Sequence, residues 1–199
     1  MNVIGDDEIR GIVSRVLNQA LGLSSAAAPE AAPAAPTNPG AAEISPQPPP
    51  QVIAIGADHG GFELKEILKP ELAAAGWQVI DAGTHSREPV DYPDIAHEVA
   101  VMVSTGKACR GIVIDGAGIG SCMVANKVPG VRAGLAYDHA SAVNSRAHND
   151  ANLLTLGAGL IGVTLARQIV RTWLSTPFEG GRHAGRVAKI TVVERQHLK

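Results

Sequence analysis

The sequence has 199 residues, of which 45% are apolar and only 3% aromatic, and its net charge is −2 at pH 7. This composition is typical of one globular domain with an aliphatic core, and it gives no reason to expect nucleic acid or a membrane as a partner. The two cysteines form no spacing motif and no secretory signal begins the sequence, so we expect reduced thiols in the cytoplasm. The uncharged stretch 151–166 is shorter than the roughly 20 residues that span a bilayer.

Residues 1–23 contain a predicted amphipathic helix over residues 6–21. Acidic residues lie in its first turn and Gly22 follows its end, as is typical of helix termini. Its apolar residues recur at the helical spacing i, i+3, i+4 and i+7: Ile9, Ile12, Val13, Val16, Leu17, Ala20 and Leu21. Because about four turns of isolated helix are marginal in water, we expect this stripe to cover a surface.

Residues 24–50 consist almost entirely of Ala, Pro, Ser and other small or polar types. Repeated prolines forbid regular structure and little here can be buried, so this segment is predicted to be a disordered, semi-extended linker. A helix on such a tether is predicted to be a docking peptide for another protein. The alternative is that it packs back on its own domain or oligomer.

From residue 51 to residue 199, apolar strand-like runs alternate with helical patterns. Strands are expected over 52–57, 77–81, 111–115, 131–136 and 152–156. Helices are expected over 62–75, 91–103, 119–127, 138–148 and 163–175, and a basic C-terminal segment follows. This alternation predicts an α/β fold, a doubly wound, Rossmann-like, five-stranded parallel sheet. Ligands of such sheets bind at the carboxyl ends of the strands.

A glycine-rich turn over residues 116–120 follows the third strand, which ends on Asp115. Backbone N–H groups of such a turn point into one small space, which suits an anionic ligand or a developing oxyanion. A dinucleotide site is disfavoured, because Ser121 stands where the third glycine of G-x-G-x-x-G belongs and Asp115 would lie close to a pyrophosphate.

Further polar residues follow other elements and suit a small phosphorylated substrate: Asp58, His59, His148, Asn149, Arg182 and Arg186. Each also has a structural alternative. Asp58 could cap the following helix, His148 could interact with a helix dipole, and the two arginines could form a solvated face. It is their combination that favours a binding site.

Five segments carry a more specific pattern: Ile55–Lys65, Val90–Asp94, Ala125–Lys127, Ser145–Asp150 and Phe178–His183. In this order they resemble the motifs of the ribose-5-phosphate isomerase B and galactose-6-phosphate isomerase family, over about residues 52–195. Residues 1–23 on their linker resemble the encapsulation peptides of bacterial microcompartment cargo enzymes, although this second pattern is short and much less specific.

The family resemblance implies an aldose–ketose isomerisation through a cis-enediol, with no metal or other cofactor. It implies that Asp58 and His148 assist ring opening and proton transfer, and that His59, Arg182 and Arg186 hold the phosphate. The sugar and the enediolate would then be bound by Asn149 and by the N–H groups of Gly116, Ala117, Gly118, Ile119 and Gly120. The family shares its sites across a homodimer interface, so His148 and the arginines would meet the glycine loop of another subunit.

The chain departs from this family at the position of the catalytic base and at one phosphate-binding position. Many relatives have a cysteine that takes the proton from carbon 2 where this chain has Asp115, and others have a glutamate where it has Ser121. We therefore expect Asp115 to be the catalytic base, since a positioned carboxylate can remove a proton next to a carbonyl. Cys122 is an alternative base that we expect instead to pack in its helix. Gly159 replaces an arginine that helps to bind phosphate, which weakens that binding or admits another substrate.

The sequence thus predicts an aldose–ketose isomerase, with ribose 5-phosphate and ribulose 5-phosphate as the first choice of substrate pair. Two alternatives remain open: an isomerase of another sugar phosphate such as a 6-phospho-hexose, and a homologue that binds a sugar phosphate without turning it over. The expected partners are the sugar phosphate, further copies in a dimer or a dimer of dimers, and a shell protein bound through residues 1–23. We expect the protein in the cytoplasm, inside a bacterial microcompartment.

Overall fold

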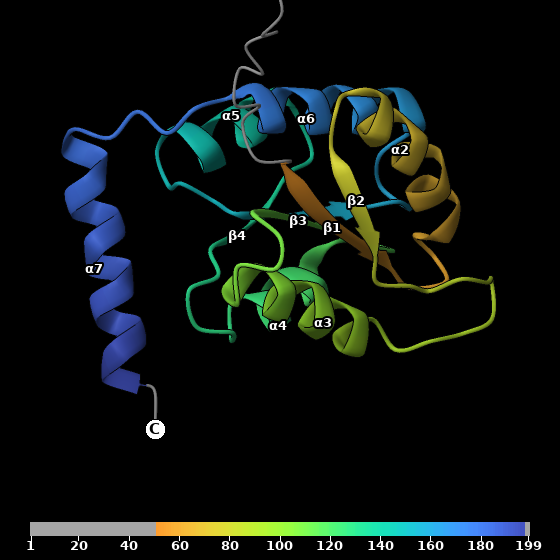
Figure 1. The fold of residues 1–199 in the computed structure, drawn as a ribbon, viewed down its shortest axis with the longest axis horizontal. Helices are drawn as coiled ribbons and strands as arrows, with labels where there is room; N and C mark the ends of the chain where they lie inside the picture. Colours follow the sequence, from red (N-terminus) through yellow and green to blue (C-terminus); the bar gives the residue numbers. More distant parts are fainter. Residues whose placement is uncertain (1–50, 198–199) are drawn as a thin grey trace, which may run out of the picture. The chain divides into compact units, whose positions relative to one another are not determined.

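A five-stranded, all-parallel sheet forms the centre of the computed structural model, which describes residues 51–197 (Figure 1). The strands are β1 (Val52–Ala57), β2 (Gln78–Asp81), β3 (Arg110–Asp115), β4 (Ala133–Leu135) and β5 (Leu153–Gly157), in the order β2-β1-β3-β5-β4. The helices are α2 (Phe62–Ala74), α3 (Tyr92–Ser104), α4 (Ile119–Ala125), α5 (His139–Ala147), α6 (Val163–Ser175) and α7 (Arg182–His197). The α/β, doubly wound, Rossmann-like fold expected from the sequence is confirmed.

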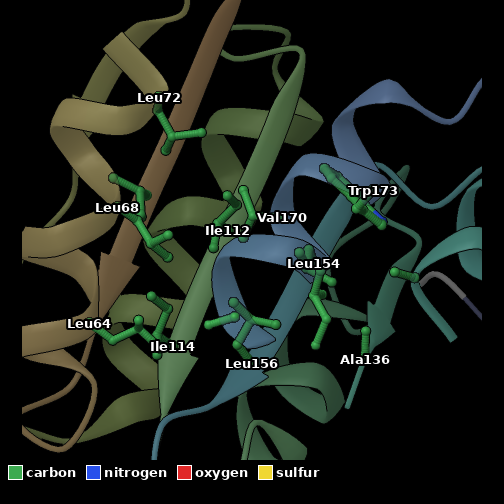
Figure 2. Close-up of a cluster of buried hydrophobic side chains, with 14 of the residues drawn as sticks. Leu64, Leu68, Leu72, Ile112, Ile114, Ala136, Leu154, Leu156, Val170 and Trp173 are labelled. Atoms are coloured by element: carbon green, nitrogen blue, oxygen red, sulfur yellow. The ribbon is translucent and has the colours of Figure 1, made fainter. Parts of the chain in front are cut away.

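Helices cover both faces of the sheet, and each face has its own core. On one face α2, α5 and α6 pack against the strands, and Figure 2 shows the large aliphatic side chains and Trp173 gathered there. On the other face α3 and α4 pack through smaller residues, among them Ala54, Ala100 and Val113. Because both faces are covered, β3 and β5 are buried along almost their whole length, which explains their continuous apolar sequences.

A buried lysine lies among these apolar side chains. The side chain of Lys65 on α2 is fully buried, and its Nζ donates to Asp81 Oδ1 at 2.6 Å and to the carbonyl oxygen of Thr84 at 2.7 Å. A buried charge is tolerated only with such partners. This contact fixes the start of the loop that leads from β2 to α3.

The expected boundaries differ from the observed ones mainly at the edge of the sheet. The strand expected over 131–136 is shorter, Ala133–Leu135, because it pairs only with β5. The sequence did not predict that the basic C-terminal segment forms the long helix α7. The predicted helix over 6–21 and the linker over 24–50 lie outside the described residues.

Helix α7 stands apart from the helices that pack on the sheet and differs from them in its burial (Figure 1). Only His183, near its start, is buried, whereas Ile190, Val192 and Val193 are about half exposed. Near its end Glu194 accepts a hydrogen bond from the N–H of Gly130 at 2.5 Å. Among residues 51–197, no helix is long and apolar enough to cross a membrane.

Candidate active site

Two acidic residues lie side by side at the carboxyl edge of the sheet. Asp58 follows β1, Asp115 ends β3, and the two strands are direct neighbours. The N–H of Asp58 donates to the carbonyl oxygen of Ile114 at 3.1 Å, which ties the turn after β1 to the end of β3. Both side chains are more than 90% buried. The sequence-based expectation that these residues share one edge of the sheet is confirmed.

The Asp58 carboxylate has a local structural role. Its Oδ1 accepts a hydrogen bond from the N–H of Gly61 at 2.9 Å, the residue immediately before α2. This bond closes the turn before α2 and does not cap the helix, whose N-cap residue is Gly61, so the helix-capping alternative is not borne out. The second oxygen is left for a ligand at the same edge.

The Asp115 carboxylate is held entirely by the loop that follows it. Oδ1 accepts from the N–H of Ala117 at 2.8 Å and from the N–H of Gly118, and Oδ2 accepts from the N–H of Ser121 at 3.1 Å and from its hydroxyl at 2.5 Å. A carboxylate offers about four acceptor positions, so all of them are used. The N–H groups of Ala117 and Gly118, which we expected to face a ligand, donate to Asp115 here.

The glycine loop is fixed from several sides. Gly118 has φ of 77°, a left-handed conformation that favours glycine, and a Cβ there would clash with Leu135 and with the backbone of Leu156. The Tyr137 hydroxyl donates to the carbonyl oxygen of Ala117 at 2.8 Å. These contacts give the loop one conformation before any ligand arrives.

Gly159 also lies against this loop. Its N–H donates to the carbonyl oxygen of Gly116 at 2.9 Å, and a Cβ at this position would approach the same oxygen to 2.9 Å. Any larger residue here would require the loop to shift. Gly159 therefore has two consequences. It allows the glycine loop to pack closely against residue 159, and it leaves the site without the arginine that relatives have at this position.

A cavity of about 340 Å³ opens next to the same edge, between the start of α2 and the start of α6. The exposed residue His59 lines it, as does Gly60, where a Cβ would lie 3.7 Å from the N–H nitrogen of Gly116. The cavity and the glycine loop are thus neighbours. A larger groove of about 500 Å³ between α2 and α6 is lined by none of the predicted site residues.

A second group of predicted residues gathers where α5 ends and α7 begins. The rings of His148 and His183 are stacked, with centroids 4.1 Å apart and planes inclined by 3°. Glu179 Oε2 lies 3.7 Å from the Nε2 atom of each ring, and Asn144 Nδ2 lies 2.9 Å from His148 Nδ1. His148 ends α5, as its structural alternative proposed, yet its ring remains partly exposed.

The other predicted residues of this group are exposed. Asn149 follows His148, and Arg182 and Arg186 lie on one face of the first turns of α7. The Arg182 guanidinium Nε is 3.4 Å from Nε2 of His183. Burial, together with the neighbouring charges of His148 and Arg182, lowers the pKa of His183.

The two groups lie at opposite edges of the sheet. Asp115 pairs with Gly157 at the carboxyl edge, whereas the turn after His148 is bonded at the amino edge, where the backbone oxygen of Asp150 accepts from Arg132 Nε at 2.9 Å. Strand β3 from Gly111 to Asp115 alone spans about 13 Å at about 3.3 Å per residue. Within one chain, therefore, His148 and the arginines do not reach the glycine loop.

Among the described residues, one group has the composition of a metal site: His148, Glu179 and His183, whose ligand atoms all lie within 4.8 Å of one another. An imidazole binds a metal in the plane of its ring, and two parallel stacked rings cannot both contain the same ion in their planes. This arrangement therefore does not suit a metal unless one ring turns. The arrangement is instead that of two stacked imidazoles, His148 and His183, which share the carboxylate of Glu179.

Sequence reasoning missed three residues that organise these two groups. Glu179 and His183 lie in a segment that we quoted for its family resemblance, but neither was given a role. Tyr137 follows β4 without any local motif, so its contact with the loop 20 residues earlier had no signal in the sequence.

Cys122 packs as expected: its thiol points to the carbonyl oxygen of Ala133 at 3.5 Å, and burial raises its pKa.

A parallel α/β sheet with two buried carboxylates, a preorganised glycine loop and a cavity at its carboxyl edge defines an α/β protein that binds a small molecule. Comparison with known proteins is more specific. Residues 53–190 match the model of the family described as Ribose/Galactose Isomerase. Ribose-5-phosphate isomerase B of Escherichia coli is 45% identical over 144 residues, which cover 72% of this chain and 97% of the relative.

Two further comparisons agree. The D-erythrulose-4-phosphate isomerase of Pectobacterium atrosepticum is 43% identical over 148 residues, 72% of this chain and 95% of the relative. The solved structure of Clostridium thermocellum ribose-5-phosphate isomerase B is 50% identical, with a TM-score of 0.73 over 74% of this chain and 99% of that one. This chain belongs to the ribose/galactose isomerase family.

Proposed function

We propose that this protein is an aldose–ketose isomerase that interconverts ribose 5-phosphate and ribulose 5-phosphate through a cis-enediol. Membership of the family and 45–50% identity to ribose-5-phosphate isomerases B support the reaction class. The observation that carries the proposal for this chain is the juxtaposition of Asp58, Asp115 and the glycine loop at one edge of the sheet.

The proposed chemistry assigns one task to each group. Asp115 takes the proton from carbon 2, and the electron pair moves to the carbonyl oxygen at carbon 1 to form the enediolate. The N–H groups of the loop that do not bind Asp115, those of Gly116, Ile119 and Gly120, stabilise that oxyanion. His148 and Asp58 move protons at the sugar oxygens during ring opening. His59, Arg182 and Arg186 bind the phosphate, and Asn149 binds the sugar.

Asp115 can act in this way only if one of its acceptor positions becomes free. Three of its four donors are backbone N–H groups that the loop holds in place, whereas the fourth is the hydroxyl of Ser121, which can rotate about a single bond. In the proposed reaction the Ser121 hydroxyl turns away as the substrate arrives. The vacated Oδ2 position then receives the proton.

A complete site further requires two copies of this chain. His148 and the two arginines lie at the amino edge, and the glycine loop lies at the carboxyl edge. A homodimer, or a dimer of dimers, in which α5 and α7 of one subunit approach the loop of another would bring both groups to one substrate. The half-exposed apolar residues of α7 are consistent with such an interface.

The test is isomerisation of ribose 5-phosphate in deuterium oxide, with NMR measurement of deuterium at carbon 1 of ribulose 5-phosphate and, after the reverse reaction, at carbon 2 of ribose 5-phosphate. Asp115→Asn is expected to lower kcat by about a hundredfold or more, the usual contribution of a general base. Asp138→Asn is the matched control, because this exposed carboxylate only caps α5. Isomerisation that continues at the normal rate in Asp115→Asn would exclude Asp115 as the base.

A different sugar phosphate is an alternative substrate. The relative from Pectobacterium atrosepticum is a D-erythrulose-4-phosphate isomerase at 43% identity, so this level of similarity does not fix the sugar. Comparing kcat/KM for phosphorylated aldoses of four, five and six carbons decides between them. A 6-phospho-hexose preferred by tenfold or more would replace ribose 5-phosphate in the proposal.

A sugar-phosphate-binding homologue without turnover is the second alternative. The saturated Asp115 carboxylate favours it, since its four acceptor positions are all occupied and none is free to receive a proton from carbon 2. Gly159, with no side chain to contact a phosphate, points in the same direction. Saturable binding of ribose 5-phosphate without deuterium incorporation would establish this alternative.

We also propose that residues 1–23 recruit the enzyme to the shell of a bacterial microcompartment in the cytoplasm. The support is the amphipathic pattern of residues 6–21 followed by an Ala/Pro-rich linker. Fusion of residues 1–23 to a fluorescent protein should produce puncta in cells that assemble shells, and Val13→Asp with Leu17→Asp should abolish them. Diffuse fluorescence of the unmodified fusion in such cells would contradict the proposal.

A further inference from the structure

The cavity beside His59 contains an arginine that neither the sequence motifs nor the proposed mechanism uses. Arg87 lies in the loop between β2 and α3 and lines this cavity together with Glu63, Gly60 and Gly162. Its guanidinium Nη2 is 2.6 Å from Glu63 Oε1, and both side chains are largely exposed. The arginine therefore reaches a solvent-filled space and is not part of the core.

The loop that carries Arg87 is anchored at both of its ends. At its start the carbonyl oxygen of Thr84 accepts from the buried Lys65 Nζ at 2.7 Å. Near its end the backbone of Val90 lies 3.3 Å from Nδ1 of His59, which itself lines the cavity. Arg87 thus lies in an anchored loop whose end contacts the imidazole of His59, and both residues line the cavity.

The start of α6 also lines the cavity, through Gly162 and Val163. Gly162 stands immediately before this helix of 13 residues, and no side chain caps it. The exposed N–H groups of a helix start attract anions. An arginine, an imidazole and a helix start therefore converge on one space, and that space adjoins the glycine loop through Gly60.

We propose that Arg87 is a substrate-binding residue that takes the phosphate of the sugar phosphate in this cavity, together with His59. The inference rests on the proposed function and adds a cation to the site. A guanidinium carries five N–H donors and binds a phosphate through two of them at once. Glu63 uses one of these donors, so the others remain available for a phosphate.

Because Glu63 and Arg87 carry opposite charges, the proposal predicts opposite effects on phosphate affinity when each is replaced. Its carboxylate orients the guanidinium but also places a negative charge beside the incoming phosphate. Because the Glu63 side chain is 67% exposed, water screens this repulsion and the arginine dominates. Removing the arginine should therefore weaken phosphate binding, whereas neutralising the glutamate should leave it unchanged or strengthen it.

The experiment measures KM and kcat for ribose 5-phosphate in Arg87→Ala, Arg87→Lys and Glu63→Gln. We expect Arg87→Ala to raise KM by about tenfold to a hundredfold, the effect of one lost hydrogen bond between charged groups, with kcat within about threefold. Arg87→Lys should fall between Arg87→Ala and the unmodified protein, because lysine keeps the charge but not the paired donors. Glu63→Gln should not raise KM.

Arg171→Ala is the matched control. Arg171 is as exposed as Arg87 and also faces a glutamate, Glu71 at 3.4 Å, but it lines the groove between α2 and α6 that holds none of the site residues. Its KM should equal that of the unmodified protein. A KM for Arg87→Ala within twofold of the Arg171→Ala value would overturn the inference.

A direct binding measurement separates this inference from the proposed function. Inorganic phosphate is titrated into each variant, and binding is measured by calorimetry. If the unmodified protein does not isomerise ribose 5-phosphate but Arg87→Ala loses phosphate affinity, the inference stands and the proposed function fails. If isomerisation is normal and Arg87→Ala binds phosphate as tightly as Arg171→Ala does, the inference fails and the proposed function stands.

Discussion

Ser121 donates two hydrogen bonds to the carboxylate of Asp115, one from its backbone N–H at 3.1 Å and one from its hydroxyl at 2.5 Å. Both residues are buried, one at the end of β3 and the other in the first turn of α4. The pair therefore closes the glycine loop and at the same time occupies one oxygen of the proposed base. The hydrogen bonds that stabilise the loop therefore occupy the same carboxylate oxygen that would accept the proton from the substrate.

Ser121→Ala distinguishes these two uses of the carboxylate. The substitution removes the hydroxyl and keeps the backbone N–H, so one acceptor position of Asp115 becomes free. If Asp115 is the base, kcat for ribose 5-phosphate should stay within about threefold or rise, while the free energy of unfolding falls by about 1 kcal/mol. A loss of activity as large as that of Asp115→Asn would show that the hydroxyl is itself required.

Lys65 and Lys69 both bind Asp81, but only Lys65 is buried. Lys65→Met leaves Asp81 and the carbonyl oxygen of Thr84 without their buried cation, and we expect the free energy of unfolding to fall by about 3–5 kcal/mol. Lys69→Met, its control on the same helix, should cost no more than about 1 kcal/mol, because that side chain is 28% exposed. Urea denaturation of both variants measures the difference, and equal losses would contradict this assignment.

Two glycines should respond in opposite directions to alanine. A Cβ on Gly61 would clash with the carbonyl oxygen of Ile114, so Gly61→Ala should destabilise the fold by about 1–3 kcal/mol or more. Gly185 lies inside α7 with nothing within 4 Å of such a Cβ, so Gly185→Ala should stabilise the helix by about 0.5–1 kcal/mol. Thermal or urea unfolding reports both, and a neutral Gly61→Ala would show that β3 can move.

His183 should make stability depend on pH. Its pKa is lowered in the folded protein by burial and by the charges of His148 and Arg182. In the unfolded chain the imidazole binds a proton near pH 6.5, so between that value and the lower folded pKa the unfolded state holds more protons. The free energy of unfolding should therefore decrease as the pH falls from about 7.5 to about 5.5.

His183→Asn should reduce this pH dependence, as measured by urea denaturation at both pH values. His139→Asn is the control, because His139 is exposed at the start of α5. If His183→Asn and the unmodified protein lose the same stability between the two pH values, another group is responsible.

Much of the fold could be predicted because local patterns and tertiary packing agree. The run from Gly111 to Asp115 is continuous and apolar, as expected of a strand buried on both faces, and it forms β3. The helix over Val163–Ser175 matches its prediction fully, since its apolar stripe faces the core through Ala166, Ile169 and Trp173. Helix α7 escaped prediction because it has almost no buried face, so no apolar period marks it in the sequence.

The candidate site was predictable only in part. The sequence by itself determined the family, the parallel sheet and the position of Asp58 and Asp115 at its carboxyl edge, because strand ends follow from local pattern and the strand–helix alternation predicts parallel strands. Only the tertiary structure decided that Asp115 is saturated by its own loop, that His148 lies at the opposite edge, and that Arg87 shares a cavity with His59. These relationships join residues far apart in the chain, or depend on the direction of single side chains, and neither is encoded in a local spacing.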